Sequence, residues 1–316
     1  EVIRSGARPG LQALVETCGM EGQAVDGDAI SYRLAPRLNA AGRISHSRMA
    51  VQLLTANDPI AANRISMELS RLNTERQNRE NQILAEIDRI ILKWGETIDD
   101  RHALVLSGDR WHEGILGIAA SRLVHRHHKP TILISTGDGI GKGSARSIPG
   151  FDLYQALKQC EDLLAGSGGH AMAAGIQIEA EKVSAFSKRF ELVSGALLSE
   201  KAPDPPHFID KEIDFGAITP KLLDELVLLQ PFGTQNPAPL FMTRNIKVHS
   251  SRLVGTRHRQ MVLVQNKGPL SAKIRAIQFN VGSDAPSPER ISSLVYHLGW
   301  NYWKGRRSIQ VNVVDL

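Results

Sequence analysis

Apolar residues recur along the chain with different spacings, and each spacing marks a different kind of element. Residues 1–57 show short helical patterns separated by loops. From there, apolar positions three or four apart predict one long helix, with Asn57 or Asp58 as its N-cap and Gly95 at its end. Residues 73–82, in its middle, have no apolar side chain. Such a helix favours a solvent-spanning connection between two domains.

Between residues 97 and 200, short β-type runs alternate with helical runs. The strands are expected at 103–106, 131–134 and 175–178, and the helices at 115–124, 151–164 and 181–198. This alternation is typical of a mixed α/β domain. The following segment, residues 201–239, begins with a proline-rich linker and continues into a helix expected at 218–229.

Residues 240–316 contain about five β-type runs separated by turns, which favours a small barrel of the oligonucleotide-binding (OB) type. The predicted fold class is therefore α/β plus β, with a mixed α/β domain after a long interdomain helix and an OB-type β-barrel at the end. The predicted domains are a helical segment at 1–57, a connecting helix at 58–96, an α/β domain at 97–200, a linker and helix at 201–239, and a barrel at 240–316.

The net charge of +5 hides a strong asymmetry along the chain. Residues 240–316 carry 12 Lys or Arg against three Asp or Glu, a net charge of +9, so that the remainder is −4. Lys and Arg that neutralise phosphates gain affinity because they release bound counterions. Nucleic acid is therefore the leading candidate partner of the barrel.

Composition excludes several other classes of protein. Hydrophobic residues make up 42% and charged residues 22%, as in globular proteins, and no apolar run approaches the ~20 residues that cross a bilayer, so no membrane partner is expected. Cys18 and Cys160 lie far apart, which argues against a disulfide framework or a cysteine zinc site and favours the cytoplasm. Glu1 opens no signal peptide, and we expect the sequence to continue upstream of it.

Two glycine-rich segments are candidates for phosphate binding. The first, residues 137–147, combines glycines with Ser144 and Arg146, and it predicts either a phosphate cradle or a hairpin turn with surface cations. Its spacing does not fit a P-loop. The second, residues 166–170, is expected between a helix and a strand, where its glycines would bring His170 close to a substrate or would simply end the helix before a packed histidine.

Other polar motifs give weaker evidence for a binding or catalytic site. Residues 111–114, which include His112, open a helix whose N-terminus suits an anion. The histidines at 125–128 suggest a metal site, but adjacent helical residues point in different directions, and cations are favourable at a helix C-terminus. The acidic pairs at 26–28 and 99–100 indicate solvated loops. No metal site is predicted in this segment of the protein.

Aromatic and basic residues occur together near the end of the chain. Aromatic faces stack on unpaired bases while cations follow the phosphate backbone. Strand alternation places Trp300 and Tyr302 on one face and Trp303 on the other, so we expect at least one of them in the core. The DNA-binding candidates are Arg252, Arg257, Arg259, Lys273, Arg275, Trp300, Tyr302 and Arg306.

Five motifs in order resemble the RecJ family of bacterial single-strand-specific exonucleases, which belongs to the DHH phosphoesterases. They are PRLNAAGR at 36–43, WHEG at 111–114, GSARS at 143–147, GGHAMAAG at 168–175 and PFGTQNPAPLF at 231–241. The resemblance spans essentially the whole chain. It implies a C-terminal remnant of the metal-binding DHH domain at 1–57, a DHH-associated domain at 97–200 and an OB barrel at 240–316.

The resemblance also implies an activity and roles for particular residues. The activity is 5′→3′ hydrolysis of single-stranded DNA in repair and recombination, with Mn²⁺ or Mg²⁺ held upstream of Glu1 and this segment binding and orienting the DNA. Single-strand-binding protein and a helicase are implied as partners. Ser144 and Arg146 would contact a DNA phosphate, with the 5′ end as one option, and His170 would be a catalytic residue. The further substrate contacts implied are Asn39, Arg43, His112, Gly168 and Gly169. Ala145 departs from the family pattern, which often has glycine there.

Two alternatives remain open from the sequence. One is a DHH-family phosphoesterase that acts on short oligonucleotides or cyclic dinucleotides, although a +9 barrel exceeds what a dinucleotide needs. The other is a non-catalytic single-strand-binding module. A salt titration of DNA binding, with and without residues 240–316, would distinguish them.

Overall fold

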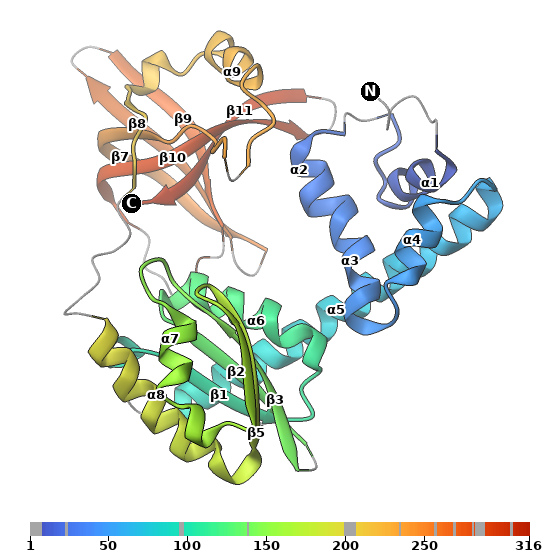
Figure 1. Cartoon of the computed structure of the whole chain (residues 1–316). Helices are drawn as coiled ribbons and strands as arrows, with labels where there is room; N and C mark the ends of the chain where they lie inside the picture. The colour runs from blue at the N-terminus through green and yellow to red at the C-terminus, as the bar shows by residue number, and fades with distance from the viewer. Residues whose placement is uncertain are drawn as a thin grey trace. The chain divides into compact units, whose positions relative to one another are not determined.

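A computed structural model of the chain divides into two compact units, residues 1–205 and 206–316 (Figure 1). The structure describes residues 8–22, 25–94, 98–137, 139–198, 207–233, 235–255, 258–267, 270–279, 281, 288–303 and 306–316. In these ranges no helix is long and apolar enough to cross a membrane.

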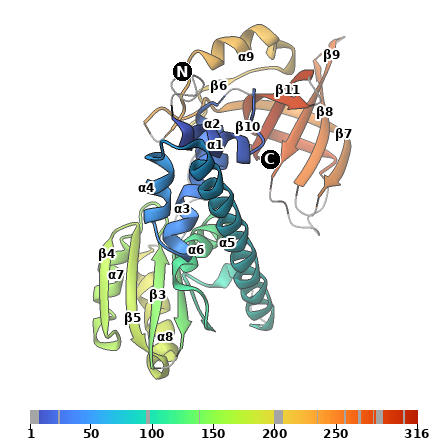
Figure 2. The ribbon, with the colours of Figure 1, turned by 90° about the vertical axis from the view of Figure 1, so that its right-hand side faces the viewer.

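The first unit begins with short helices that pack against one long helix. The short elements are α1 (Pro9–Thr17), α2 (Gly27–Ala29), the π-helical turn η1 (Ile30–Leu34), α3 (Ala35–Ile44) and α4 (Arg48–Leu54). The long helix is α5 (Pro59–Lys93), and Figure 2 shows it running alongside α3 and α6. Leu14, Leu53 and Leu69 are fully buried where α1, α4 and α5 meet. This core explains why the first helices are ordered.

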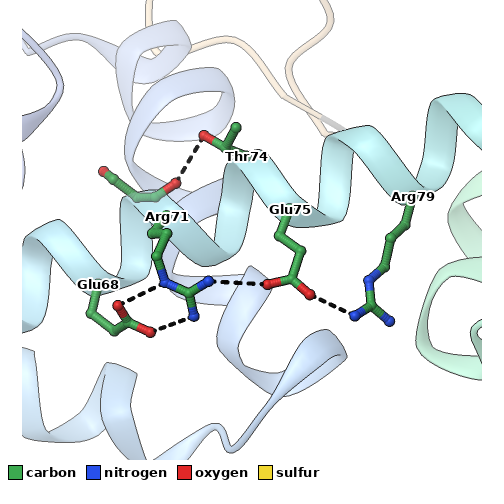
Figure 3. A network of polar contacts seen from close by, with 6 residues as sticks. Glu68, Arg71, Thr74, Glu75 and Arg79 are labelled. Carbon is green, nitrogen blue, oxygen red and sulfur yellow. Dashed lines mark hydrogen bonds and ion pairs between the residues drawn. The ribbon is translucent and has the colours of Figure 1, made fainter.

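Helix α5 begins and ends close to where the sequence predicts. The Asp58 carboxylate accepts hydrogen bonds from the backbone N–H groups of Ile60 and Ala61, both at 3.1 Å, as an N-cap does. Its exposed face carries a ladder of ion pairs, Glu68–Arg71–Glu75–Arg79, with N–O distances of 2.6–3.3 Å (Figure 3). Pairs of this spacing support a helix that packs on one side only.

The middle of α5 differs from the prediction that it spans solvent. Asn73 is 5% exposed and Glu80 is fully buried. The reason is that α6 (Glu113–His127) packs against α5, so that polar side chains in the middle of the helix meet polar partners rather than water. The prediction of an all-round solvated middle is wrong, because sequence polarity alone does not distinguish a solvated face from a buried charged contact.

The α/β part of the first unit is a five-stranded mixed sheet in the order β1-β2-β3-β5-β4. Its strands are β1 (Leu104–Asp109), β2 (Thr131–Thr136), β3 (Ile140–Arg146), β4 (Gly166–His170) and β5 (Ala173–Glu179). Strands β1 and β2 are parallel, and the other pairs are antiparallel. Helix α6 packs on β2 and β3. On the opposite face, α7 (Leu153–Lys158) and α8 (Val183–Leu197) bury Phe186 and Phe190 in a second core.

Both glycine-rich segments form strands. Residues 140–146 are β3, so Ser144 and Arg146 lie on a strand within the sheet and not in a loop or turn. Residues 166–170 are β4 at the edge of the sheet, not a loop between a helix and a strand. The helix expected at 151–164 is shorter, because α7 ends at Lys158 and a 3₁₀ turn, η3 (Glu161–Leu163), follows. Cross-strand pairing of glycine backbones overrides their low strand propensity.

The second unit is a closed five-stranded barrel in which neighbours follow the order β7-β8-β9-β11-β10 and β10 pairs back with β7. The strands are β7 (Phe241–Val254), β8 (His258–Lys267), β9 (Leu270–Gln278), β10 (Arg290–Trp303) and β11 (Arg306–Asp315). Among these five strands, β9 and β11 pair in parallel and the other neighbours are antiparallel. This is the predicted OB-type barrel.

Residues 207–239 are more than a linker and a helix. Strand β6 (Lys211–Glu212) pairs with the start of β7, and the turn η5 (Phe215–Ala217) follows it. Phe215 and Leu223, the latter on α9 (Pro220–Val227), are buried in the barrel core with Tyr296. The segment therefore belongs to the barrel unit, because it supplies apolar side chains that close one end of the core.

Candidate nucleic-acid interface

The sheet of the first unit has one face that α6 covers only in part. Register pairs across a sheet share a face, so Ser144 on β3, Gly175 on β5 and Gly168 on β4 form one row. Ser144 faces α6, since a Cβ added at Gly117 of that helix would lie 3.1 Å from its Oγ. The whole row therefore lies on the α6 side. Gly175 and Gly168 are exposed, which leaves bare backbone beside the helix.

This bare backbone, with Gly166, forms a hollow that we call the glycine floor. The hollow has a volume of about 550 Å³. Its lining includes Ser144, Gly166, Gly168 and Gly175, with Glu113 of α6 along one side. The missing side chains allow a ligand to approach the sheet closely. A flat or elongated group has room to lie on the floor next to the N-terminal turn of α6.

Arg146 lies one row further along the same face, and α6 holds it in place. Its Nη1 donates to the backbone oxygen of Ala145 at 2.8 Å and to Ser144 Oγ at 3.2 Å. A Cβ at Gly117 would lie 2.5 Å from Arg146 Nη2, so a larger residue there would displace the guanidinium from this position. Burial lowers the pKa of Arg146, and the positive charge of Arg43 lowers it further. The guanidinium is pre-oriented, and no carboxylate of the described residues neutralises it directly.

Arg146 belongs to a group of four arginines, two of which contact one carboxylate, that of Glu80, and we call this group the arginine cluster. Its members are Arg43 on α3, Arg76 on α5, Arg122 on α6 and Arg146 on β3. Arg76 donates to Glu80 Oε2 at 2.9 Å. The contact of Arg122 Nε with Glu80 Oε1, at 2.6 Å, is an ion pair that falls short of hydrogen-bond geometry.

Charge in the arginine cluster is only partly balanced. Burial lowers the pKa of Arg76; Glu80 opposes this shift, whereas Arg122 and Arg43 add to it. The Glu80 carboxylate pairs with two of the four guanidinium groups, so the cluster keeps an excess of positive charge where water is partly excluded. Such a site favours a phosphate or another anion. The sequence analysis did not identify Arg76, Glu80 and Arg122 as site residues. The four-residue spacing of Arg76 and Glu80 on one helix could have indicated an ion pair between them.

The N-terminal turn of α6 contacts the end of α3, and this contact positions Arg43 near Arg146. A Cβ at Gly114 would lie 2.2 Å from the backbone oxygen of Arg43, so glycine is required for this contact. Arg43 Nη1 in turn donates to the backbone oxygen of Gly114 at 3.4 Å. His112 is the N-cap of α6, and its Nδ1 accepts from the Gly114 N–H at 3.2 Å. The prediction that residues 111–114 open a helix is confirmed, and the His112 ring has a capping role. Asn39 is exposed on α3, one turn before Arg43.

His170 is exposed on β4 and shares the row of Arg146, with Ala173 of β5 between them. Two strand spacings separate their backbones, about 10 Å. Gly169 has φ +153, and a Cβ there would lie 2.4 Å from the Ala173 backbone oxygen, so only glycine permits this hairpin. The structure thus brings together Arg43, Ser144, Arg146, Gly168 and His170 on or beside one face.

Metal ligands do not gather in the described part of the chain. No group of three or more His, Cys, Asp or Glu there could hold a metal ion. The histidines at 125–128 lie at the C-terminal end of α6, where His128 is a left-handed C-cap. The described residues therefore do not supply the ligands of the divalent metal that the family resemblance implies. The side chains and backbone groups at this site suit an anion instead.

The barrel carries its cations differently, on the outer face of its strands. Lys273 and Arg275 are exposed on β9 and alternate with the buried Ile274 and Ala276. Neither forms a side-chain hydrogen bond or ion pair with any residue that the structure describes. In OB folds, the face of the second and third strands, here β8 and β9, binds oligonucleotides. Arg252 and Arg306 are also exposed, and Arg252 Nε donates to Gln260 Oε1 at 2.9 Å.

Four of the predicted DNA contacts in the barrel need correction or lie outside the described residues. Arg259 is only 5% exposed, because it shares the inner face of β8 with the buried Met261 and Leu263, and a DNA contact there is not supported. Trp300 packs against the barrel core, and Arg307 covers its ring at 3.9 Å. Arg257 and the side chain of Tyr302 are the two outside the described residues.

Two family models match the chain over these elements. A DHHA1 domain matches residues 100–194, and a RecJ OB domain matches residues 209–315. The fold and the site thus define the class of protein: it is one in which a DHHA1 domain is followed by a RecJ-type OB barrel.

Similarity to individual proteins extends over the whole chain. The chain is 35% identical over 329 residues to the single-stranded-DNA-specific exonuclease RecJ of Escherichia coli strain K12, and the match covers 99% of this chain and 55% of that protein. For RecJ of Bacillus subtilis strain 168 the identity is 32%, with 100% and 40% covered. A crystal structure of RecJ from Thermus thermophilus in complex with Mg²⁺ matches with a TM-score of 0.79 and 30% identity, covering 99% of this chain and 47% of that one.

The chain belongs to the RecJ family. It spans about half the length of the relatives it matches.

Proposed function

We propose that this chain is the substrate-handling portion of a 5′→3′ single-stranded-DNA exonuclease that acts in DNA repair and recombination. The observation that carries the proposal is the arginine cluster beside the glycine floor, on the same chain as a barrel with exposed outer cations. The first grips one phosphate in a fixed position. The second attracts a polyanion without regard to its sequence.

The cluster and the floor suit the end of a single strand. Arg146 and Ser144 would hold a DNA phosphate, with Arg43 as a second cation, and the 5′-terminal phosphate is the one we assign to them. The next nucleotide would lie on Gly168 and Gly175, where no side chain obstructs it. His170, in the row of Arg146, is placed to hold or move a proton near the scissile bond. Asn39 and His112 would border the phosphate from α3 and α6.

The metal chemistry belongs to a part of the protein that these residues do not supply. The matched Thermus RecJ structures contain Mg²⁺ or Mn²⁺. We propose that the whole protein uses one of these ions to activate water for attack on the phosphodiester. The residues of this chain bind the strand, orient it and exclude water from the floor. Single-strand-binding protein and a helicase are proposed partners, and the cytoplasm is the proposed location.

The domain division follows the two compact units. We propose residues 1–57 as the end of the DHH domain, α5 as the connecting helix and residues 97–200 as the DHHA1 domain. The OB domain is proposed to include β6 and α9, because Phe215 and Leu223 lie in its core.

The proposal is tested by single-strand digestion with the complete protein in the presence of Mn²⁺ or Mg²⁺. Arg146→Ala removes a charge-assisted phosphate contact worth about 1.5–3 kcal/mol, so activity on 5′-phosphorylated strands should fall by about 10- to 100-fold. The control is Arg71→Ala, an exposed arginine whose ion pairs lie away from the cluster. Equal activity of the two variants would show that Arg146 does not belong to the site. If the complete protein prefers a dinucleotide to a long strand, the alternative of a small-nucleotide phosphoesterase is favoured.

A further inference from the structure

The barrel has a second hollow, where β7 and β10 close it. Its volume is about 550 Å³, and its lining is Asn245, Ile246, Lys247, Arg290, Ile291 and Ser292. We call this place the barrel seam. None of its residues is among the predicted DNA contacts, and the seam is not part of the β8–β9 face.

The β7–β10 ladder lacks one pair at the seam, although its register does not shift. The β7–β10 register passes from Ile246–Ile291 to Arg244–Ser293, so Asn245 and Ser292 lie between two pairs. Asn245 has φ +58, in the left-handed region, which asparagine adopts more readily than most residues other than glycine. The side chains of Asn245 and Ser292 are exposed there, and both can hydrogen-bond to a ligand. A polar gap in the ladder of a barrel wall is a local departure from complete pairing, and a residue in the left-handed region is one of the features that cluster at functional sites.

Two like charges face one another across the opening. Lys247 and Arg290 are register partners, and both are exposed on the outer face, next to the buried pair Ile246–Ile291. Like charges directly opposite each other on paired strands are destabilising. Neither side chain has a hydrogen-bond or ion-pair partner among the residues that the structure describes. By contrast, Arg244 on the same strand pairs with Glu212 at 3.2 Å. An anion between Lys247 and Arg290 would relieve the repulsion.

The seam is connected to the β8–β9 face by register. Lys247 of β7 pairs with Val264 of β8, which pairs with Lys273 of β9. Arg290, Lys247 and Lys273 thus lie in one row across four strands, about 14 Å from end to end at three strand spacings. A row of cations of this length can follow more than one phosphate of a single strand.

We infer that the barrel seam is a phosphodiester-binding site, in which Lys247 and Arg290 hold a backbone phosphate of single-stranded DNA that continues from the β8–β9 face. This inference rests on the proposed function, because it takes single-stranded DNA as the ligand. It adds a site and a direction for the strand around the barrel, from β9 across β8 and β7 to β10.

The test is binding of fluorescein-labelled oligothymidylate to the 316-residue chain over a range of salt concentrations. A short probe of about 8 nucleotides and a long one of about 30 are used, because one OB fold covers about 4–16 nucleotides. The double variant Lys247→Gln/Arg290→Gln should weaken binding of the long probe more than that of the short one. The slope of log K against log salt should become shallower by about 0.7 for each phosphate that is no longer neutralised. Arg244→Gln is the control, and it should leave both slopes unchanged.

The stability of the same variants separates a binding role from a structural one. Because the substitutions remove a repulsion, the urea midpoint at low salt should stay the same or rise. A fall in the midpoint would assign the pair a structural role and overturn the inference. An unchanged salt slope for Lys247→Gln/Arg290→Gln would also overturn the inference. If Lys273→Gln/Arg275→Gln makes the slope shallower in the same assay, the β8–β9 face still binds DNA, and the proposed function stands without the seam. If the wild-type chain does not bind the oligothymidylate at all, both the inference about the seam and the proposed DNA-binding function of the chain are wrong.

Discussion

The cations of the two units differ in what holds them. In the first unit, Arg76 and Arg122 are tied to the buried Glu80, and Arg146 is fixed by Ser144 and by the space that Gly117 leaves. On the barrel, Lys273 and Arg275 are exposed and have no partner among the described residues. The first arrangement restricts each guanidinium to one orientation, whereas the second leaves long side chains free to follow a ligand.

This difference matches two kinds of phosphate recognition. A held guanidinium loses little entropy when it binds, so it can define the position of one phosphate. Mobile surface cations contribute mainly by counterion release, which attracts a strand of any sequence and depends strongly on salt. An exonuclease that removes nucleotides in succession needs both, because it must keep hold of the strand and still place each new end at the same point.

The largest expected effect comes from removing the carboxylate that holds the cluster. Glu80→Ala leaves the largely buried Arg76 without its ion-pair partner and with Asn73 Oδ1 as its remaining acceptor, so the free energy of unfolding should fall by about 3 kcal/mol. Urea unfolding of the chain measures this change. The matched control is Glu68→Ala on the exposed face of the same helix, where little change is expected (Figure 3). If both variants lose the same stability, Glu80 does not organise the cluster.

A second variant separates the position of Arg146 from its charge. In Gly117→Ala the new methyl group would lie 2.5 Å from Arg146 Nη2, at the end of a flexible side chain that can move aside. Stability should stay the same or rise by up to about 1 kcal/mol, because alanine favours the helix over glycine. Activity of the complete protein on 5′-phosphorylated strands should nevertheless fall about tenfold, as expected for a misplaced charge-assisted hydrogen bond. Full activity would show that the orientation of Arg146 is unimportant.

The barrel cations should act more weakly and through salt. Lys273→Ala/Arg275→Ala should reduce affinity for single-stranded DNA several-fold near physiological salt, with a salt slope shallower by about 1.4 because two phosphates are no longer neutralised. Binding of oligothymidylate and of a mixed-sequence strand should weaken equally, since these residues carry no base recognition. A change confined to one sequence would contradict the assignment of the barrel to backbone tracking.

The smallest effect at neutral pH concerns the inside of the barrel. Burial raises the pKa of Tyr296 to about 12, and its hydroxyl lies 2.7 Å from Thr243 Oγ1. Because the phenol titrates near pH ~10 in the unfolded chain, its contribution to stability is complete below about pH 10 and is lost as the pH rises towards about 12. Tyr296→Phe should cost about 1 kcal/mol at neutral pH and should flatten the loss of stability above about pH 10. Tyr154→Phe, at an exposed position, should leave that pH dependence in place.

Much of the fold could be predicted from local pattern. The long helix follows from its apolar spacing and from Asp58 and Pro59 at its start, and five short β-type runs in a basic segment predict the barrel. Four of the motifs that indicate the family lie on or beside the elements that form the site. These features depend on residues close together in the sequence, so propensity and periodicity are sufficient to find them.

Other features were decided by contacts between distant segments. The glycine-rich segments become strands because β3, β5 and β4 pair, and only that register places Ser144, Gly175 and Gly168 in one row. Arg259 and Arg275 have the same chemistry, yet the barrel wall turns one inward and the other outward. Glu80 looked like a solvated residue in a polar run, and only the packing of α6 against α5 buries it. Local sequence is sufficient to define which elements form and which charges the chain carries. Which of those charges come together depends on burial and strand pairing, because these join residues that lie far apart along the chain.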